Sequence, residues 1–214
     1  MSDVIVDAAG THLDGFLDVP AHARGLVVFA HGSGSTRFSN RDRYVADELN
    51  LNGYATLLFD LLTVEEYRED TETGLIRHNV GLLADRLTGA VDWAGTQTSL
   101  KSLPVGLFGS DTGAAAALAT AAERAANVQA IVSQGGRPDL AGNALPWVKA
   151  PTLLIVGGHD VRGLEVNRHA ATFLRGENRI ALVPGAGHTF DEPGALQSVA
   201  ELARDWYHDW LRAR

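Results

Sequence analysis

The segment VGLFGSDTGAAAAL, residues 105–118, joins a short apolar run to an alanine-rich stretch through a turn that contains Asp111. Gly109 and Gly113 stand two residues before and two residues after Asp111. A sharp strand-to-helix turn needs small residues at both places, because the strand and the helix pack closely there. Centring the turn on Ser110 would put larger residues at the flanks, so Ser110 is a poor candidate. The spacing predicts a nucleophile elbow with Asp111 at its tip.

An aspartate at the start of a helix is also typical of an N-cap, so the elbow needs support from elsewhere in the chain. Asp160 and His188 each follow a predicted strand, at residues 152–156 and 179–183. Polar residues at the carboxyl ends of strands build the sites of α/β sheets. Nucleophile, acid and histidine also occur in the chain order that the elbow requires. The three residues predict a triad in which Asp160 orients His188, the general base, beside Asp111.

The rest of the chain alternates between two patterns. Short apolar runs typical of buried parallel strands lie at residues 25–30, 55–60, 105–109, 128–133, 152–156 and 179–183. Segments with helical spacing lie at residues 41–51, 82–94, 113–126, 165–174 and 195–211. This alternation predicts an α/β fold with a mostly parallel central sheet flanked by helices. Residues 4–19 predict antiparallel edge strands, and the polar residues 63–79 predict a mobile surface excursion or part of a lid.

Length and composition limit the organisation and the partners. The chain has 214 residues, 45% of them hydrophobic, which favours a single catalytic domain over residues 1–214 with minimal or no cap domain. A formal charge of -8 argues against nucleic acid as a partner. The chain shows no signal-peptide pattern and no run of roughly 18 apolar residues, so we expect a cytoplasmic protein without a membrane partner. A small-molecule substrate is expected, and a homo-oligomer stays open.

A loop of small residues follows the first buried strand, from His31 through Ser33 and Gly34. Such a loop turns backbone N–H groups toward a developing oxyanion, with the amide of the residue after the nucleophile as second donor. Ser33, Gly34 and Thr112 are therefore the predicted oxyanion hole. No Gly-Lys-Ser/Thr ending follows, which argues against a phosphate loop, and His31 is predicted to hold the loop rather than to catalyse.

No cofactor and no metal are predicted. Absence of cysteine excludes disulfides and thiolate chemistry. His159, Asp160, His188 and Asp191 are of ligand type, but their spacing matches no established metal-binding pattern. His159 is better interpreted as a structural or exposed loop residue.

Over nearly its whole length the chain resembles the dienelactone hydrolase-like branch of the α/β-hydrolases. The resemblance rests on VVFAHGSGSTRFSNRDRYVA (27–46), ATLLFDLLT (55–63), VGLFGSDTGAAAAL (105–118), IVSQGGRPDLAG (131–142), PTLLIVGGHD (151–160) and VPGAGHTFDEPGAL (183–196). It implies a small α/β-hydrolase fold without a large cap domain, with Asp111 at the nucleophile position, Asp160 as acid and His188 as base. The elbow of that branch usually reads Gly-Ala-Ser-Thr-Gly, whereas here it reads Gly-Ser-Asp-Thr-Gly.

Aspartate changes the chemistry expected at an elbow. An aspartate side chain in water has a pKa of about 3.9 and needs no base to become a nucleophile at neutral pH. Attack on an ester carbonyl would give a reactive mixed anhydride, whereas attack on a saturated carbon gives a stable alkyl ester that activated water can hydrolyse. The expected substrates are therefore epoxides or alkyl halides. Dehalogenases that resemble this scheme commonly place Trp or Arg directly after the nucleophile, where this chain has Thr112, so epoxide opening is the leading hypothesis.

An epoxide oxygen needs a proton or a hydrogen bond as the ring opens. Tyr44, Tyr67 and His78 are the candidates for that role, and Trp147 is a candidate wall of the substrate pocket. Three alternatives stay open: a dehalogenase, an esterase or lactonase in which Asp111 only positions water, and a non-catalytic binding protein that retains the pocket.

Overall fold

The computed structural model describes residues 1–212, so the last two residues of the domain predicted over 1–214 lie outside the described residues. Across the described residues the strands form one 8-stranded sheet in the order β1-β2-β4-β3-β5-β6-β7-β8. The strands are β1 (Ser2–Ala8), β2 (Thr11–Asp18), β3 (Leu26–Ala30), β4 (Ala55–Phe59), β5 (Val105–Ser110), β6 (Val128–Gln134), β7 (Thr152–Gly157) and β8 (Asn178–Val183).

The sheet is parallel from β4 to β8 and antiparallel at one edge. β1 and β2 form an antiparallel hairpin, and β2 also pairs antiparallel with β4, which confirms the edge strands predicted from residues 4–19. The other neighbouring strands pair in parallel. The carboxyl ends of β3, β5, β6, β7 and β8 therefore meet at one edge of the sheet.

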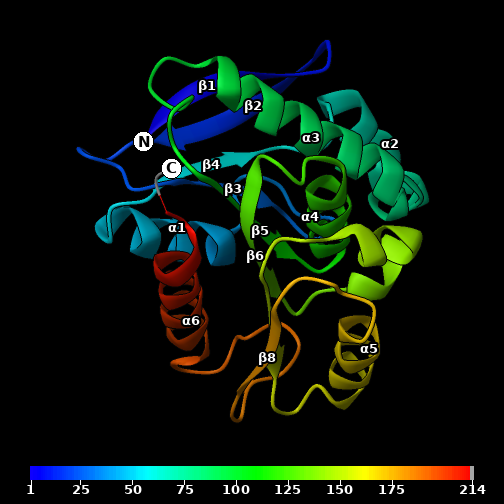
Figure 1. Ribbon diagram of the computed structural model, residues 1–214. Helices are drawn as coiled ribbons and strands as arrows, with labels where there is room; N and C mark the ends of the chain where they lie inside the picture. The colour runs from blue at the N-terminus through cyan, green and yellow to red at the C-terminus, as the bar shows by residue number, and fades with distance from the viewer. Residues whose placement is uncertain (213–214) are drawn as a thin grey trace.

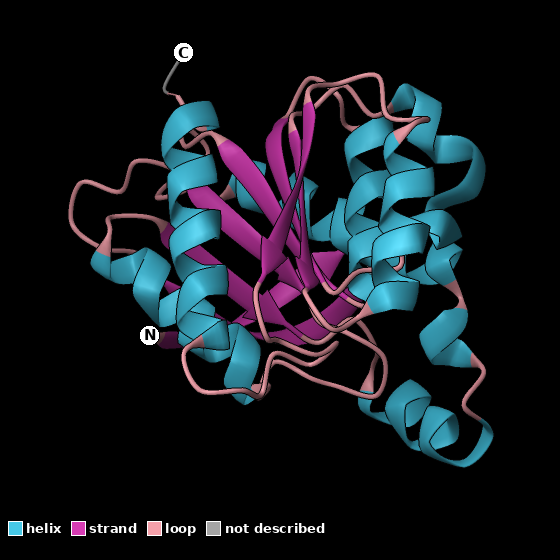
Figure 2. Ribbon diagram, turned by 90° about the horizontal axis from the view of Figure 1, so that it is seen from below, coloured by secondary structure: helices cyan, strands magenta, loops and turns pink. Residues whose placement is uncertain are grey.

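Helices cover both faces of the sheet, as Figure 2 shows. They are α1 (Asn40–Leu51), α2 (Val64–Thr73), α3 (Val80–Thr96), α4 (Thr112–Glu123), α5 (Val161–Ala171) and α6 (Ala195–Trp210), with 3-10 helices η1 (Ile76–His78) and η2 (Pro138–Trp147). One buried cluster packs α1 and α6 against one face, and a second packs α3, α4 and α5 against the other (Figure 1). Both faces of the central strands are thus buried, which explains their continuous apolar sequences.

Two segments differ from their predicted structure. α5 begins at Val161 rather than at residue 165, because the Asp160 side chain accepts the Gly163 N–H and caps the helix there. The polar stretch 63–79, predicted as a mobile surface excursion or part of a lid without an assigned helix, forms α2 and η1. A capping box between Thr63 and Glu66 begins α2, so local polar contacts stabilise a helix that lacks an apolar stripe.

The strand order and the parallel centre are those of the α/β-hydrolase fold. Within the described residues, the connection from β6 to β7 carries η2, which has 10 residues and a kink at Gly142, and no cap-sized insertion. No helix in this part of the chain is both long enough and apolar enough to span a bilayer.

Candidate active site

Asp111 occupies a strained turn between β5 and α4. Its φ of 48° and ψ of -119° lie in a region that non-glycine residues rarely adopt. A Cβ at Gly113 would overlap the carbonyl oxygen of Ala30, and a Cβ at Gly109 would overlap the backbone of Ala114. Both glycines are therefore needed for the close approach of strand and helix, and the local structure is that of a nucleophile elbow.

The side chain of Asp111 does not cap the helix that it precedes. Asp111 stands at the N-cap position of α4, but its carboxylate makes no capping hydrogen bond. Its Oδ2 instead accepts the backbone N–H of Ser33 at 3.2 Å. The main-chain oxygen of Asp111 accepts the N–H groups of Ala114 and Arg137, which hold the turn in place. The carboxylate is thus directed toward the loop that follows β3.

That loop is held tightly against the elbow. A Cβ at Gly32 would lie 3.0 Å from the Cβ of Asp111, so only glycine fits comfortably at this point. His31 is buried, and its Nε2 accepts the N–H of Leu61 at 3.0 Å while its Nδ1 lies 3.1 Å from the Gly32 oxygen. Burial lowers the pKa of His31, which favours the neutral ring that these contacts require. His31 holds the loop, as the sequence predicts.

The three residues predicted as an oxyanion hole lie around Asp111 but make different contacts. Ser33 donates its N–H to the carboxylate, and its hydroxyl lies 3.0 Å from that of Thr112. The described residues show no hydrogen bond from the N–H of Thr112 or Gly34 to Asp111. Gly34 instead lies beside Arg77, whose Nη1 would be 3.0 Å from a Cβ at Gly34. Ser33 is the donor that the structure brings to the carboxylate.

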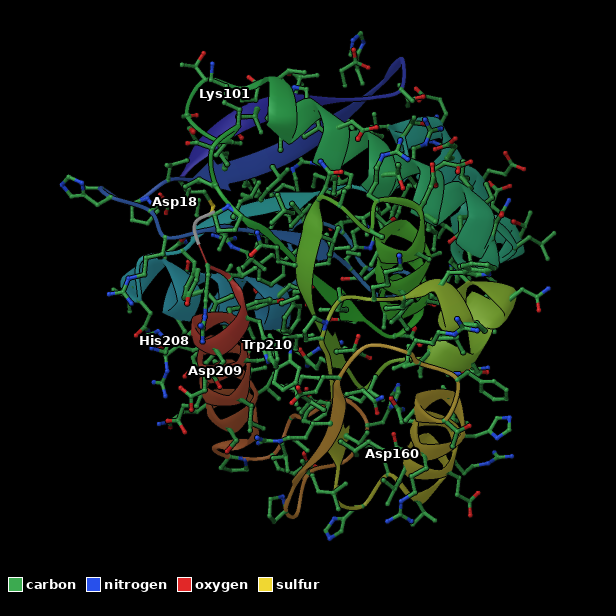
Figure 3. The ribbon with its side chains drawn as sticks, in the orientation of Figure 1. Asp18, Lys101, Asp160, His208, Asp209 and Trp210 are labelled. Atoms are coloured by element: carbon green, nitrogen blue, oxygen red, sulfur yellow. The ribbon has the colours of Figure 1, made fainter. Side chains whose placement is uncertain are left out.

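Asp160 and His188 meet at the ends of β7 and β8. The Nδ1 of His188 lies 2.9 Å from Oδ2 of Asp160, and Oδ1 of Asp160 accepts the Gly163 N–H at 2.8 Å. Asp160 is labelled in Figure 3 at the beginning of α5. The Asp160 side chain is 13% exposed and that of His188 is 51% exposed. The buried carboxylate thus fixes one ring nitrogen and leaves the other available to the solvent side.

A single cleft brings Asp111 and His188 together. It measures about 220 Å³ and is bordered by the β3 loop, the start of α1 and the ends of β5, β6 and β8. No hydrogen bond joins His188 to Asp111 within the described residues. The cleft lining comprises Gly32, Ser33, Ser35, Ser39, Arg41, Asp42, Ser110, Asp111, Gln134, Gly135, His188 and Thr189.

The candidate proton donors and the candidate wall lie outside this cleft. Tyr67 is 39% exposed and borders a neighbouring cavity of about 290 Å³ on the other side of the β3 loop. Tyr44 is 38% exposed on α1, His78 is exposed at the end of η1, and Trp147 is 66% exposed at the end of η2. Tyr67 also borders a small cavity that Ser33 and Thr112 line, but none of the four side chains lines the cleft of Asp111.

Two buried polar residues of the cleft, Asp42 and Gln134, were not predicted from the sequence. Asp42 is buried in the first turn of α1, and its Oδ1 accepts the Ser110 hydroxyl at 2.9 Å. Gln134 ends β6, and its buried Oε1 has no hydrogen-bond partner in the described part of the chain. Asp42 carries an ordinary helix-start pattern with Ser39, so only its burial and its partner Ser110, at a strand end, mark it as unusual.

His159 is exposed in the turn before α5, as predicted. Of the residues considered as metal ligands, Asp160 and His188 are in contact, but no group of three or more acidic or histidine side chains in the described residues is placed to hold a metal ion.

Comparisons with known proteins agree with this geometry at the level of fold and family. The sequence model of the Dienelactone hydrolase family matches residues 13–213. The crystal structure of a dienelactone hydrolase from Anabaena variabilis is 52% identical, with a TM-score of 0.97 over 99% of this chain and 98% of that one. A lidless α/β serine hydrolase from Xanthomonas campestris, 19% identical with a TM-score of 0.78 over 100% of this chain and 96% of that one, shares the fold.

Two proteins from strains of Mycobacterium tuberculosis, provisionally named phosphoribosyl transferases, are 53% identical over 209 residues. The match covers 98% of this chain but 46% of theirs, so the chain spans less than half the length of these relatives. On the family match and the Anabaena structure together, this chain belongs to the dienelactone hydrolase family.

Proposed function

We propose that this protein is a cofactor-independent hydrolase that opens epoxides through a covalent ester on Asp111. The contact between the Ser33 N–H and Asp111 Oδ2 is the observation that carries the proposal. It assigns different roles to the two carboxylate oxygens. Oδ2 lies where an oxyanion would be stabilised, and Oδ1, to which no described residue donates a hydrogen bond, is the attacking atom.

In the first step Oδ1 attacks a ring carbon, the carbon–oxygen bond of the ring breaks, and the electron pair stays on the ring oxygen. This step needs no general base, because a carboxylate is already the nucleophilic form. The strained turn of Asp111 exposes the carboxylate to the cleft in a fixed orientation, which lowers the entropy cost of attack. The product of this step is an alkyl ester of Asp111.

In the second step His188 removes a proton from water, and the hydroxide adds to the carboxyl carbon of Asp111. The negative charge develops on Oδ2, where Ser33 already donates, and the Thr112 N–H is the second proposed donor. Asp160 stabilises the imidazolium that forms, through its 2.9 Å contact with Nδ1. Among the described residues His188 makes no hydrogen bond to Asp111, which suits a base that acts on water rather than on the nucleophile.

Epoxides are favoured over alkyl halides because Thr112, rather than Trp or Arg, follows Asp111, and no Trp among the described residues lines the cleft. Family membership favours a second candidate, hydrolysis of an ester or lactone by water that His188 activates while Asp111 only positions it. The phosphoribosyl transferase name gives no further candidate, since this chain matches 46% of the proteins that carry it.

A parallel turnover assay tests the proposal. Styrene oxide, phenethyl bromide and phenyl acetate would be incubated with the protein and with Asp111→Ala, while diol, bromide and phenol are measured. The proposal predicts diol formation that Asp111→Ala abolishes. Phenol release without diol would support the esterase, bromide release alone would support a dehalogenase, and no turnover by any substrate would favour a binding protein.

A further inference from the structure

Epoxide opening leaves one requirement that the triad does not meet, which is a proton for the ring oxygen. His188 is assigned to the water of the second step, and Tyr44, Tyr67 and His78 do not line the cleft. A proton source must therefore be found among the side chains that border the cleft beside Asp111.

Asp42 is a buried carboxyl group at this border. Asp42 is 4% exposed. Its backbone N–H donates to the hydroxyl of Ser39, the N-cap of α1, at 3.2 Å, so its side chain is not the one that caps the helix. Carboxyl groups are almost never fully buried without a cationic partner. Among the described residues Asp42 makes no ion pair. The neighbouring Arg41 instead pairs with Asp191, at 3.4 Å. Burial without an ion pair favours the neutral acid.

Ser110 connects this acid to the cleft. Its hydroxyl donates to Asp42 Oδ1 at 2.9 Å, and it directly precedes Asp111 in the chain. Both residues line the same cleft as the nucleophile. A hydrogen-bonded path thus runs from a buried carboxyl group to a hydroxyl next to the attacking carboxylate.

The charges around Asp42 agree with a proton donor. Burial raises the pKa of the Asp42 carboxyl, and the hydrogen bond from Ser110, the His31 ring, the Ser39 hydroxyl and Arg41 act in the opposite direction. His31 supplies little opposing charge, because burial lowers its own pKa and its Nε2 accepts the Leu61 N–H.

We propose that Ser110 protonates the ring oxygen and is resupplied by Asp42, so that the two residues act as the acid of ring opening. This inference rests on the proposed function. Ser110 would be the catalytic group that touches the substrate, and Asp42 would act through it.

The protons balance over one turnover. As the ring opens, the Ser110 proton moves to the ring oxygen, the Asp42 proton moves to Ser110 Oγ, and Asp42 becomes a carboxylate. The Ser110 hydroxyl then donates to the Asp42 carboxylate. The 2.9 Å contact between the two oxygens serves transfer in both directions, because the hydroxyl hydrogen can rotate. In the second step the water proton passes through His188 to the departing alkoxide. The regenerated Asp111 acid releases one proton to solvent, and Asp42 takes one back.

The test compares two substrates that need the same nucleophile, of which only the epoxide also needs an acid. In a His188→Gln background, which stops the reaction at the ester, styrene oxide and phenethyl bromide would each alkylate Asp111, and mass spectrometry would follow the adduct. Bromide leaves without a proton, whereas the epoxide oxygen requires one. The ratio of the two rates therefore isolates the acid.

Ser110→Ala and Asp42→Asn are each expected to lower the epoxide-to-bromide rate ratio about 100-fold. Asp191→Asn, which removes another carboxylate near Arg41, is the matched control and should leave the ratio unchanged. The ratio should also fall with rising pH in the parent, as Asp42 loses its proton, and this dependence should vanish in Asp42→Asn. In this background the titratable groups that face the reaction are Asp42, Asp111, Arg41 and, behind Asp42, His31.

An unchanged ratio in both variants, with normal circular dichroism, would overturn the proton relay and leave the proposed function standing. Adduct formation by the bromide without any by the epoxide would instead overturn epoxide hydrolysis, and the relay with it. No adduct from either substrate would exclude Asp111 as the nucleophile.

Discussion

Asp111 and Asp42 are two carboxyl groups of one cleft with opposite surroundings. Asp111 stands at the tip of a strained turn and accepts a backbone N–H from Ser33. Asp42 lies buried in the first turn of α1 behind the Ser110 hydroxyl, and burial raises its pKa. One environment favours a carboxylate that attacks, and the other favours an acid that donates. Surroundings rather than residue type thus divide the two roles.

Asp111→Asn should produce the largest effect on turnover. The amide has nearly the same shape but is a poor nucleophile, so diol formation should fall about 10⁵-fold or more. Steady-state kinetics would measure the loss, and thermal unfolding should show that the fold is intact. Asp111→Ala serves as a control for slow deamidation to aspartate. A rate near that of the parent would show that Asp111 is not the nucleophile, and Asp111 and Asp42 would then not divide the roles of nucleophile and acid.

Asp160→Asn should come next, and it should act on the second step. Asparagine can still cap α5 through the Gly163 N–H, but it cannot stabilise the His188 imidazolium, so turnover should fall about 10⁴-fold. The alkylated form of Asp111 should then accumulate and be visible by mass spectrometry. Loss of turnover without an adduct would mean that Asp160 acts before the ester forms.

Gly113→Ala should damage the elbow while leaving the helix that carries Asp42 unaffected. The added methyl group would overlap the Ala30 carbonyl oxygen, so we expect a destabilisation of about 3 kcal/mol in urea unfolding. Gly95→Ala is the matched control, because a Cβ there meets no atom within 4 Å in helix α3. Equal stability of Gly113→Ala and the parent would show that the close strand–helix approach is not required.

The smallest effect should be the one that Asp42→Asn has on stability, which should depend on pH. Because the pKa of Asp42 is raised in the folded protein, its contribution to stability is full at low pH and is lost as the pH rises through the folded-state pKa. The melting temperature of Asp42→Asn minus that of the parent should therefore grow as the pH rises above about 4, the pKa of an aspartate in the unfolded chain. Asp47→Asn, which changes an exposed carboxylate on the same helix, is the control. A constant difference would indicate that Asp42 does not titrate abnormally.

The fold could be predicted well from the sequence, because the two patterns that determine it, the apolar strands and the glycines around Asp111, are each contained in a short segment. The apolar strands are short and continuous, and Gly109 and Gly113 mark the one turn that forces strand against helix. The helix over 64–73 was not predicted because it has no apolar stripe, and its stability comes from the capping contacts of Thr63 and Glu66. A capping contact also explains why α5 begins earlier than predicted. The Asp160 side chain accepts the Gly163 N–H, and the sequence alone does not show that contact.

The site was predicted less completely than the fold. Asp111, Asp160 and His188 follow predicted strands, so their arrangement at one sheet edge could be inferred from order alone. The contact of Ser110 with Asp42 joins residues 68 positions apart, and nothing in either local sequence indicates it. Tyr44, Tyr67 and His78 were chosen by residue type, and the orientation of α1, α2 and η1 places them elsewhere.

Oxygen transfer in a single turnover distinguishes attack by Asp111 from attack by water. With enzyme in excess over styrene oxide in oxygen-18 water, the oxygen delivered to the diol should come from Asp111, while solvent oxygen enters at its carboxyl carbon. Covalent catalysis by Asp111 predicts a first-turnover diol without label and a peptide containing Asp111 that carries the label. Label in the diol, with an unlabelled Asp111, would show that water attacks the substrate directly and that Asp111 is not the nucleophile.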